Sequence, residues 1–361
     1  MATLDEDRLK QLQFLVFSKL EGAVTSGMIH LGDKLGLYRT LAAAEDRLTT
    51  AELADRAGLD ERWVREWAYN QAAARLLDVD ATEAGAERFS LAPEAVAVLA
   101  DSDHEAFGIG MFHRLPQTME TLRVLPESFR TGIGHDYDSH GLEGAAGLER
   151  SFEPWNRVHL VPDVVPELEG VVDKLTVGAR VADIGCGPGG AVLMLAAAFP
   201  ASQIAGYDIS QFALQRAAAR QLESGLANAS FHDPRVDALP ADHSLDLVTT
   251  LDCLHDMTDP QGMAVAIRAA LAEDGTWLLA DIKGRDTFAE NVEKNPMASL
   301  MYGISVYSCM SSALSAPGGA GLGTLGLPAS KAEAIATVAG FSRFRKLPVD
   351  HAVNAFYEIR V

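Results

Sequence analysis

The sequence has few cysteines and no excess of basic residues. Three cysteines occur in 361 residues, Cys186, Cys253 and Cys309, and they stand far apart without the spacing of metal ligands. This distribution argues against a disulfide framework, so we expect free thiols in a cytoplasmic protein. The formal net charge is −20, and both halves of the chain are acidic. No basic half exists to bind a nucleic-acid backbone.

Long apolar runs are absent as well. No uninterrupted apolar stretch approaches the roughly 18 residues that a membrane-spanning helix needs. The segment from Met1 to Lys10 is acidic, whereas a secretion signal begins with basic residues and continues into an apolar core. We therefore expect neither a membrane span nor secretion. With 48% hydrophobic residues, the chain can bury a large core, and its length predicts two domains.

The N-terminal part of the sequence predicts a mainly helical domain. Residues 8–44 carry apolar positions at helical spacing, which predicts two helices meeting at a bend. Thr49 and Glu52 have the spacing of a capping box, and Asp60 is the predicted cap of a second, longer helix. The turn-rich stretch that follows is typical of a two-stranded wing. The pattern predicts a winged-helix domain over residues 1–105.

Residues 106–165 are expected to form a helical connection. They include His135, Asp136, Asp138 and His140, which alternate closely in a turn-rich segment. Because no helix or strand is predicted there to bring these side chains together, we interpret the segment as a solvated loop. No metal site is predicted.

Residues 166–361 alternate between strand and helix. Such alternation predicts an α/β domain with a doubly wound, mostly parallel sheet. The last two of seven predicted strands are separated by too few residues for a crossover helix, so they must pair as an antiparallel hairpin. Residues 284–330 interrupt the pattern and are predicted to be a cap insertion. The predicted strands are 181–184, 203–207, 229–232, 245–251, 277–281, 341–349 and 354–361.

A glycine-rich turn follows the first of these strands. Gly185, Gly187 and Gly189 allow a ligand to approach the backbone closely, and a helix N-terminus follows them. The stretch from Gly185 to Gly190 also satisfies the dinucleotide pattern G-x-G-x-x-G, which leaves a nicotinamide-dependent oxidoreductase as an alternative. Asp183 precedes the turn, where its carboxylate would repel a pyrophosphate. S-adenosylmethionine carries a sulfonium and an ammonium and no phosphate, so its charge suits this turn better.

On these residues the chain resembles the class I S-adenosylmethionine-dependent methyltransferases. The segment 48–60 is similar to the N-terminal winged helix of small-molecule O-methyltransferases, and residues 255–259 are similar to their His-Asp-x-x-Asp stretch. The resemblance implies in-line methyl transfer to an oxygen, nitrogen or sulfur atom of a small molecule. It also implies a homodimer formed through the N-terminal domain.

Some members of the resembling group are labelled transcriptional regulators. A ligand-sensing DNA-binding protein that keeps the cofactor fold is therefore a second alternative. The predicted second helix of the winged helix mixes charges, with Glu61, Arg62, Arg65 and Glu66, in a strongly acidic domain. We therefore expect no nucleic-acid partner.

The resemblance assigns a set of cofactor-binding residues at strand ends. Asp208 is expected to accept both ribose hydroxyls, and Asp233 to read the adenine amino group, although Asp-Pro-Arg replaces the usual Gly-Asp pair there. The full predicted set is Asp183, Gly185, Cys186, Gly187, Gly189, Asp208, Ile209, Asp233 and Asp252.

Catalysis is assigned to the stretch after the fourth strand. His255 lies where the resembling O-methyltransferases carry their general base, and Asp256 or Asp259 is expected to orient it. The companion glutamate of those enzymes is not evident. Aromatic and sulfur side chains beside the glycine-rich part of the cap suggest a lid over an apolar acceptor. The predicted substrate contacts are Tyr302, Tyr307 and Met310 in the cap, with His113 and Trp155 in the connection.

Overall fold

The structure is a computed structural model that describes residues 4–82 and 85–361. The chain divides into two compact units. The first comprises Met1–Pro116 and Arg150–Pro154, and the second comprises Gln117–Glu149 and Trp155–Val361. Within the described ranges, no helix has both the length and the apolar character that crossing a bilayer requires.

The first unit is the predicted winged helix. The two helices expected over residues 8–44 are present, and they meet at Gly36, whose φ of 74° is in the left-handed region that favours glycine. The capping box of Thr49 and Glu52 is formed, and Asp60 caps the longer helix. A three-stranded sheet of order β1-β3-β2 supplies the wing. The elements are α1 (Glu6–Lys34), α2 (Leu37–Ala42), β1 (Leu48–Thr49), α3 (Thr50–Ala57), α4 (Glu61–Ala73), β2 (Asp78–Asp80), β3 (Arg88–Ser90), α5 (Pro93–Leu99) and α6 (Gly110–His113).

The second unit is built on a seven-stranded sheet of order β6-β5-β4-β7-β8-β10-β9. The first five strands in this order pair in parallel, and β10 pairs antiparallel with both β8 and β9. The predicted doubly wound sheet with a C-terminal antiparallel hairpin is confirmed. The strands are β4 (Arg180–Ile184), β5 (Gln203–Tyr207), β6 (Ala229–His232), β7 (Leu245–Leu251), β8 (Leu271–Ile282), β9 (Arg343–Lys346) and β10 (Asn354–Arg360).

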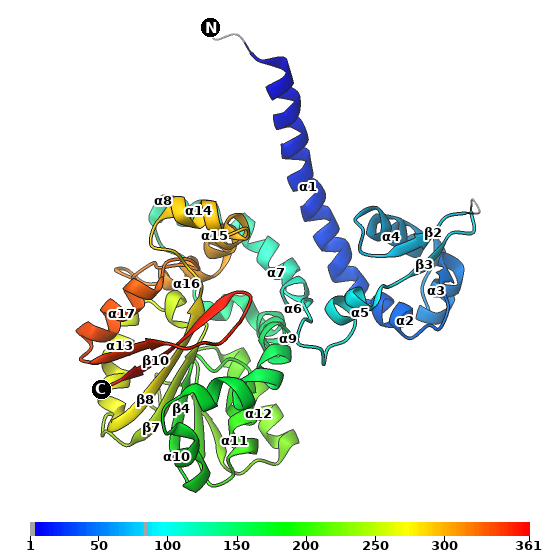
Figure 1. The fold of residues 1–361 in the computed structure, drawn as a ribbon. Coiled ribbons are helices and arrows are strands. Elements are labelled where there is room, and N and C mark those ends of the chain that lie inside the picture. The colour runs from blue at the N-terminus through cyan, green and yellow to red at the C-terminus, as the bar shows by residue number, and fades with distance from the viewer. Residues whose placement is uncertain (1–3, 83–84) are drawn as a thin grey trace. The chain divides into compact units, whose positions relative to one another are not determined.

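Helices cover both faces of this sheet (Figure 1). Because successive residues of a strand point to opposite faces, Val181 packs with α10 and α11 on one side, and Ala182 packs with α13 and α17 on the other. Each face therefore has its own apolar core. The helices of this unit are α10 (Val171–Val177), α11 (Gly190–Ala198), α12 (Gln211–Ser224), α13 (Pro260–Ala270) and α17 (Ala329–Val338).

The cap insertion after β8 forms three short helices, and the connection forms several more. The cap helices are α14 (Phe288–Lys294), α15 (Ala298–Tyr307) and α16 (Cys309–Ala313). The helices of the connection are α7 (Leu115–Glu120), α8 (Leu125–Thr131) and α9 (Gly141–His159).

One expectation for the connection was wrong. The segment around residues 135–140 is not a solvated loop, because it packs within the second unit. His140 is buried, with its Nε2 3.0 Å from the Ser308 hydroxyl oxygen, and the Asp138 carboxylate accepts a hydrogen bond from the backbone N–H of Gln211 at 3.0 Å. The sequence did not indicate these long-range partners.

Candidate active site

The glycine-rich turn leaves β4 at the carboxyl edge of the sheet, where α/β folds bind their ligands. Gly185, Gly187 and Gly189 have φ values of 69°, 52° and 81°. A Cβ at Gly185 would lie 2.7 Å from the Cys253 side chain, and one at Gly189 would lie 2.4 Å from the Phe231 ring. At Gly187 a Cβ would meet no protein atom within 4 Å. The turn is therefore closed by packing at both ends and open in the middle, where a ligand can approach the backbone.

Asp183 lies under this turn in a buried position. Its side chain is 2% exposed, and it accepts a hydrogen bond from the Thr249 hydroxyl at 2.6 Å. Burial raises the pKa of Asp183 to about 7, the Thr249 bond opposes this rise, and the nearby Asp208 carboxylate adds to it. The carboxyl group thus becomes fully charged only above neutral pH unless a cationic ligand stabilises its charge.

The raised pKa of Asp183 gives a prediction about stability. The pKa of Asp183 is higher in the folded state than in the unfolded chain, so the folded state binds this proton more tightly and is stabilised by it at low pH. The stabilisation is lost as pH rises from about 4 to about 7. Asp183→Asn removes the titration and keeps an acceptor for Thr249. We expect the stability of the ligand-free wild type, relative to this variant, to fall over that pH window and to level off above it. Urea unfolding at several pH values measures this difference, and a pH-independent difference would contradict it.

Asp208 follows β5, at the position predicted for the ribose-binding acid. Its two carboxylate oxygens accept hydrogen bonds from the backbone N–H groups of Gly187 and Ser210, both at 2.8 Å. Burial raises its pKa, and these hydrogen bonds counteract the rise. Each oxygen keeps a second lone pair, so the carboxylate is fixed in place and can still accept from two adjacent hydroxyls. Ile209 beside it is exposed, whereas Cys186 is buried.

Asp233 follows β6 directly, as expected, and its charge is already paired. The Arg235 guanidinium donates to both of its carboxylate oxygens at distances from 2.8 to 3.2 Å, and it also donates to the carbonyl of Ile209. The hydrogen bonds from Arg235 lower the pKa of Asp233. The arginine thus ties the turn after β6 to the turn after β5.

His255 lies in a short 3₁₀ helix (Leu254–Asp256) that follows β7, and it is 2% exposed. Its Nδ1 is 2.7 Å from the carboxylate of Asp281, near the end of β8. The backbone N–H of Ile282 donates to the same carboxylate oxygen at 2.8 Å, which fixes its position. The imidazole is therefore held at Nδ1 by Asp281, which leaves the other ring nitrogen on the side away from that carboxylate.

The expectation that Asp256 or Asp259 orients His255 was wrong. Asp259 caps α13 by accepting from the backbone N–H of Gly262, and the acid hydrogen-bonded to the imidazole is Asp281 rather than Asp256. The only sequence signal for Asp281 is its place as an acid near the carboxyl end of a predicted strand. Asp256 is close by, and burial raises its pKa to about 7.

The electrostatic surroundings of His255 favour its charged form. Burial alone would lower its pKa, but the Asp281 carboxylate and the side chain of Cys309 outweigh burial and raise it well above the usual value. Cys309 begins α16 and hydrogen-bonds to His255. The cap insertion thus reaches the histidine directly.

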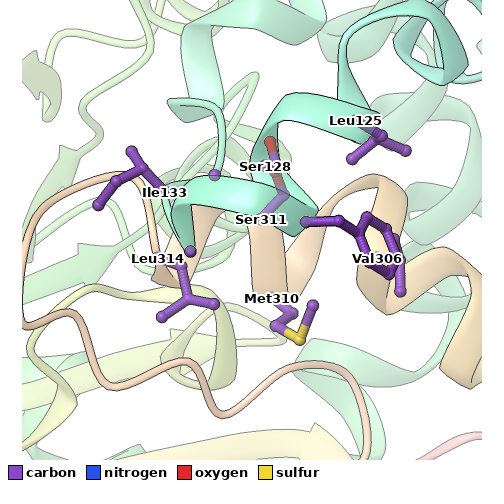
Figure 2. Close-up of a pocket in the computed structure, with 10 residues that line it drawn as sticks. Leu125, Ser128, Ile133, Val306, Met310, Ser311 and Leu314 are labelled. Atoms are coloured by element: carbon purple, nitrogen blue, oxygen red, sulfur yellow. The ribbon is translucent and has the colours of Figure 1, made fainter.

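Two cavities lie beside the cap. The first cavity has a volume of about 200 Å³ and an apolar lining. One side is formed by α8 and the residues that follow it, and the other side by α15 and α16, as the labelled side chains in Figure 2 show. The other, of about 350 Å³, lies against α14, α15 and the loop before α17, and it includes Arg285 and Lys331. Met310 lines both cavities, and Tyr302 lines the larger one.

The other predicted substrate contacts lie elsewhere. Tyr307 ends α15 in a half-buried position. Trp155 stacks on Phe356 of β10 with ring centroids 5.5 Å apart, so it supports the sheet. His113 belongs to the first unit, where its Nδ1 is 3.0 Å from the Arg150 guanidinium.

Comparisons with known families match both units. Residues 175–317 match a family described as a methyltransferase domain, and residues 23–101 match a family described as an Rv2258c-like winged HTH domain. The ubiquinone biosynthesis O-methyltransferase of Leptothrix cholodnii is 28% identical over 155 residues, which cover 42% of this chain and 60% of that protein. The corresponding enzyme of Nitrosospira multiformis is 29% identical over 155 residues, with 42% and 59% covered.

Solved structures resemble the whole chain. Human N-acetylserotonin methyltransferase in complex with SAM has a TM-score of 0.70 at 17% identity, covering 100% of this chain and 99% of that one. A putative O-methyltransferase from Nostoc punctiforme has a TM-score of 0.73 at 15% identity, with 99% of both chains covered. At these identities the likeness concerns the fold.

Proposed function

We propose that the chain is a class I S-adenosylmethionine-dependent methyltransferase with an N-terminal winged helix, and that it methylates a nucleophilic atom of a small molecule. The observation that carries the proposal is the turn after β4. The backbone is open at Gly187, whose N–H donates to the buried Asp208 carboxylate, and a second buried acid, Asp183, precedes the turn. These acids suit a cofactor that brings a sulfonium, an ammonium and ribose hydroxyls, and they oppose a pyrophosphate.

We assign the role of general base to His255, which Asp281 holds in position. Methyl transfer is an in-line displacement at the sulfonium, so the protein mainly aligns the nucleophile with the methyl group and removes its proton. With Nδ1 held by Asp281 at 2.7 Å, the neutral form of His255 takes that proton on its other ring nitrogen, where the acceptor replaces the contact with Cys309, and the Asp281 carboxylate stabilises the imidazolium that forms. An oxygen acceptor fits this arrangement best, because a hydroxyl loses a proton during methylation.

Ligand-dependent stabilisation tests the proposed cofactor. S-adenosylhomocysteine at about 100 times its Kd should stabilise the fold by about 2.7 kcal/mol, whereas NADH at the same concentration should leave the melting temperature unchanged. Calorimetric titration with both compounds gives the affinities directly. Stabilisation by NADH and none by S-adenosylhomocysteine would favour an oxidoreductase instead.

A homodimer is part of the proposal, and the N-terminal half of α1 supports it. Phe14, Val16, Phe17 and Leu20 are between 58% and 77% exposed. An exposed apolar surface of this kind marks an interaction site, and the winged-helix resemblance favours a second copy of the chain as the partner.

We predict that charges on α1 weaken the dimer. Phe17→Glu combined with Leu20→Glu places carboxylates where apolar contacts would form, so the chain should elute as a monomer in size-exclusion chromatography with light scattering. The matched control is Leu222→Glu in α12, because Leu222 is 85% exposed and lies far along the chain from α1. A monomeric wild type, or a dimer that survives both substitutions, would contradict the interface.

DNA binding is not part of the proposal. In α4, Arg62 pairs with Glu66 and Arg65 pairs with Glu61, both at 2.6 Å, so these arginines are already neutralised. This pairing supports a winged helix that does not read DNA. A cytoplasmic location is also proposed, supported by three free cysteines.

A further inference from the structure

The larger cavity beside the cap is lined by hydrogen-bond donors that have nothing to donate to. Its volume of about 350 Å³ falls within the range of small-molecule pockets, about 300–1,000 Å³. Arg285, Lys331 and Tyr302 line it, and within residues 4–82 and 85–361 none of these three side chains has a hydrogen-bond or ion-pair partner. A guanidinium, an ammonium group and a phenol hydroxyl are therefore available to one ligand.

The acid in the same lining does not neutralise these charges. Asp286 accepts a hydrogen bond from the Ser330 hydroxyl, and in the described part of the chain it forms no ion pair. The described lining residues thus carry two positive charges and one negative charge, in a chain whose formal net charge is −20. A concave surface with an excess of positive charge attracts an anion.

The backbone at Arg285 is fixed by a buried side chain. Asn291 is 2% exposed, and its Oδ1 accepts a hydrogen bond from the Arg285 N–H at 3.0 Å. Its Nδ2 donates to the Arg285 carbonyl at 3.2 Å and to the Thr287 carbonyl at 3.1 Å. Lys331 comes from the first turn of α17, which lies far along the chain. Because the arginine starts from a fixed backbone, less conformational freedom is lost when its side chain orders on a ligand.

The rest of the lining is mainly aromatic and aliphatic. The rings of Phe288 and Tyr302 are in contact, with their centroids 5.7 Å apart. Met310, Leu322 and Leu325 add apolar surface to the same cavity. Apolar and aromatic side chains favour a flat apolar body, whereas the cations favour a carboxylate, which a guanidinium can hold with two parallel hydrogen bonds. The lining therefore suits a molecule that has both parts.

This cavity borders the segments that contact His255. Met310 follows Cys309, which hydrogen-bonds to the imidazole. Leu322 precedes Gly323, whose backbone N–H donates to the His255 carbonyl at 3.2 Å. A molecule in the cavity thus contacts residues adjacent in the chain to those around the proposed general base.

We propose that this cavity binds an aromatic acid, with Arg285 and Lys331 on its carboxylate and with Phe288 and Tyr302 along its ring. The planar guanidinium supplies a bidentate contact, and the ammonium group adds a point charge. A role of this acid as the methyl acceptor rests on the proposed function, whereas its binding does not.

Titration with 2-naphthoate and 2-naphthamide tests the proposal. The two compounds have the same ring system and nearly the same shape, but only the first is charged. By calorimetry we expect the wild type to bind 2-naphthoate at least about tenfold more tightly, and added sodium chloride to weaken binding of the acid alone. Equal affinities for the two compounds, or binding of the acid that does not respond to salt, would overturn the site.

Two substitutions remove the charges one at a time. Arg285→Gln and Lys331→Met should each weaken 2-naphthoate binding by about tenfold and leave 2-naphthamide binding nearly unchanged. The matched control is Lys346→Met in β9, since Lys346 is an exposed lysine of the same unit outside the cavity lining. It should bind 2-naphthoate like the wild type. An equal loss in Lys346→Met and Lys331→Met would reduce the effect to net charge, and wild-type affinity in Arg285→Gln and Lys331→Met would place the acid elsewhere; either result contradicts the proposal.

Cofactor titration separates this site from the proposed function. All variants should bind S-adenosylhomocysteine like the wild type, which shows that the fold is intact. A wild type that binds 2-naphthoate but not S-adenosylhomocysteine would contradict the proposed function and leave the acid site standing, and the reverse result would overturn the acid site alone. An acceptor must also bind beside the cofactor, so exclusion of 2-naphthoate from the S-adenosylhomocysteine complex would overturn the acceptor role.

Discussion

Replacing His255 with alanine should lower kcat by about 10²–10⁴-fold on any hydroxyl acceptor that the wild type methylates, the range expected for loss of a general base. The affinity for S-adenosylhomocysteine should change little, because the proposed cofactor residues Asp183 and Asp208 belong to other strand ends. Steady-state kinetics and calorimetric titration provide the two readouts. Asp281→Asn should act in the same direction, since Asp281 holds His255 at 2.7 Å.

The matched control for this experiment is His243→Ala. His243 is an exposed histidine that precedes β7, with its Nδ1 3.1 Å from the carbonyl of Leu271, so it lies at the opposite end of that strand from His255. Its replacement should leave turnover near the wild-type value. An unchanged kcat in His255→Ala would remove the general-base role and leave alignment as the main contribution of the protein.

Replacing Asp208 with alanine should weaken S-adenosylhomocysteine binding by at least about 100-fold. The carboxylate can accept from two ribose hydroxyls, and each hydrogen bond to a charged group contributes about 1.5–3 kcal/mol. The substitution also removes the partner of the Gly187 N–H, which holds the turn in shape. Calorimetric titration measures the affinity.

Asp237→Ala is the control for Asp208→Ala. Asp237 is an acid of the same domain whose carboxylate pairs with His232 at 2.6 Å, and its side chain is 64% exposed. This variant should bind S-adenosylhomocysteine with nearly wild-type affinity. Equal affinities in both variants would show that the ribose is held elsewhere, and the assignment of the strand end after β5 would be wrong.

Much of the catalytic domain was predictable because its signals are local. The glycines of the turn and Asp208 sit at ends of strands, and each strand is marked by a short apolar run. The helix caps at Thr49 and Asp60 were predictable for the same reason, since a cap depends on residues two or three positions away.

The partners of His255, the proposed general base, were not predictable. Asp281 lies 26 positions after His255, and Cys309 lies in an insertion without a repeating pattern. Nearby acids such as Asp259 were plausible partners in sequence, but Asp259 is used as a helix cap. The segment around Asp138 and His140 was misread for the same reason, because its partners Gln211 and Ser308 are distant in the chain.

The sequence by itself determined the fold class and the place of the turn, and it favoured the cofactor that we propose, since alternating strands and helices, glycines in a turn and a preceding carboxylate are properties of short segments. Only the tertiary structure decided how the site is completed. Parallel pairing of β7 and β8 brings Asp252 and Asp281 to one edge of the sheet beside His255. Which side chains meet there depends on strand order and register, and these are set by burial of both sheet faces rather than by any local pattern.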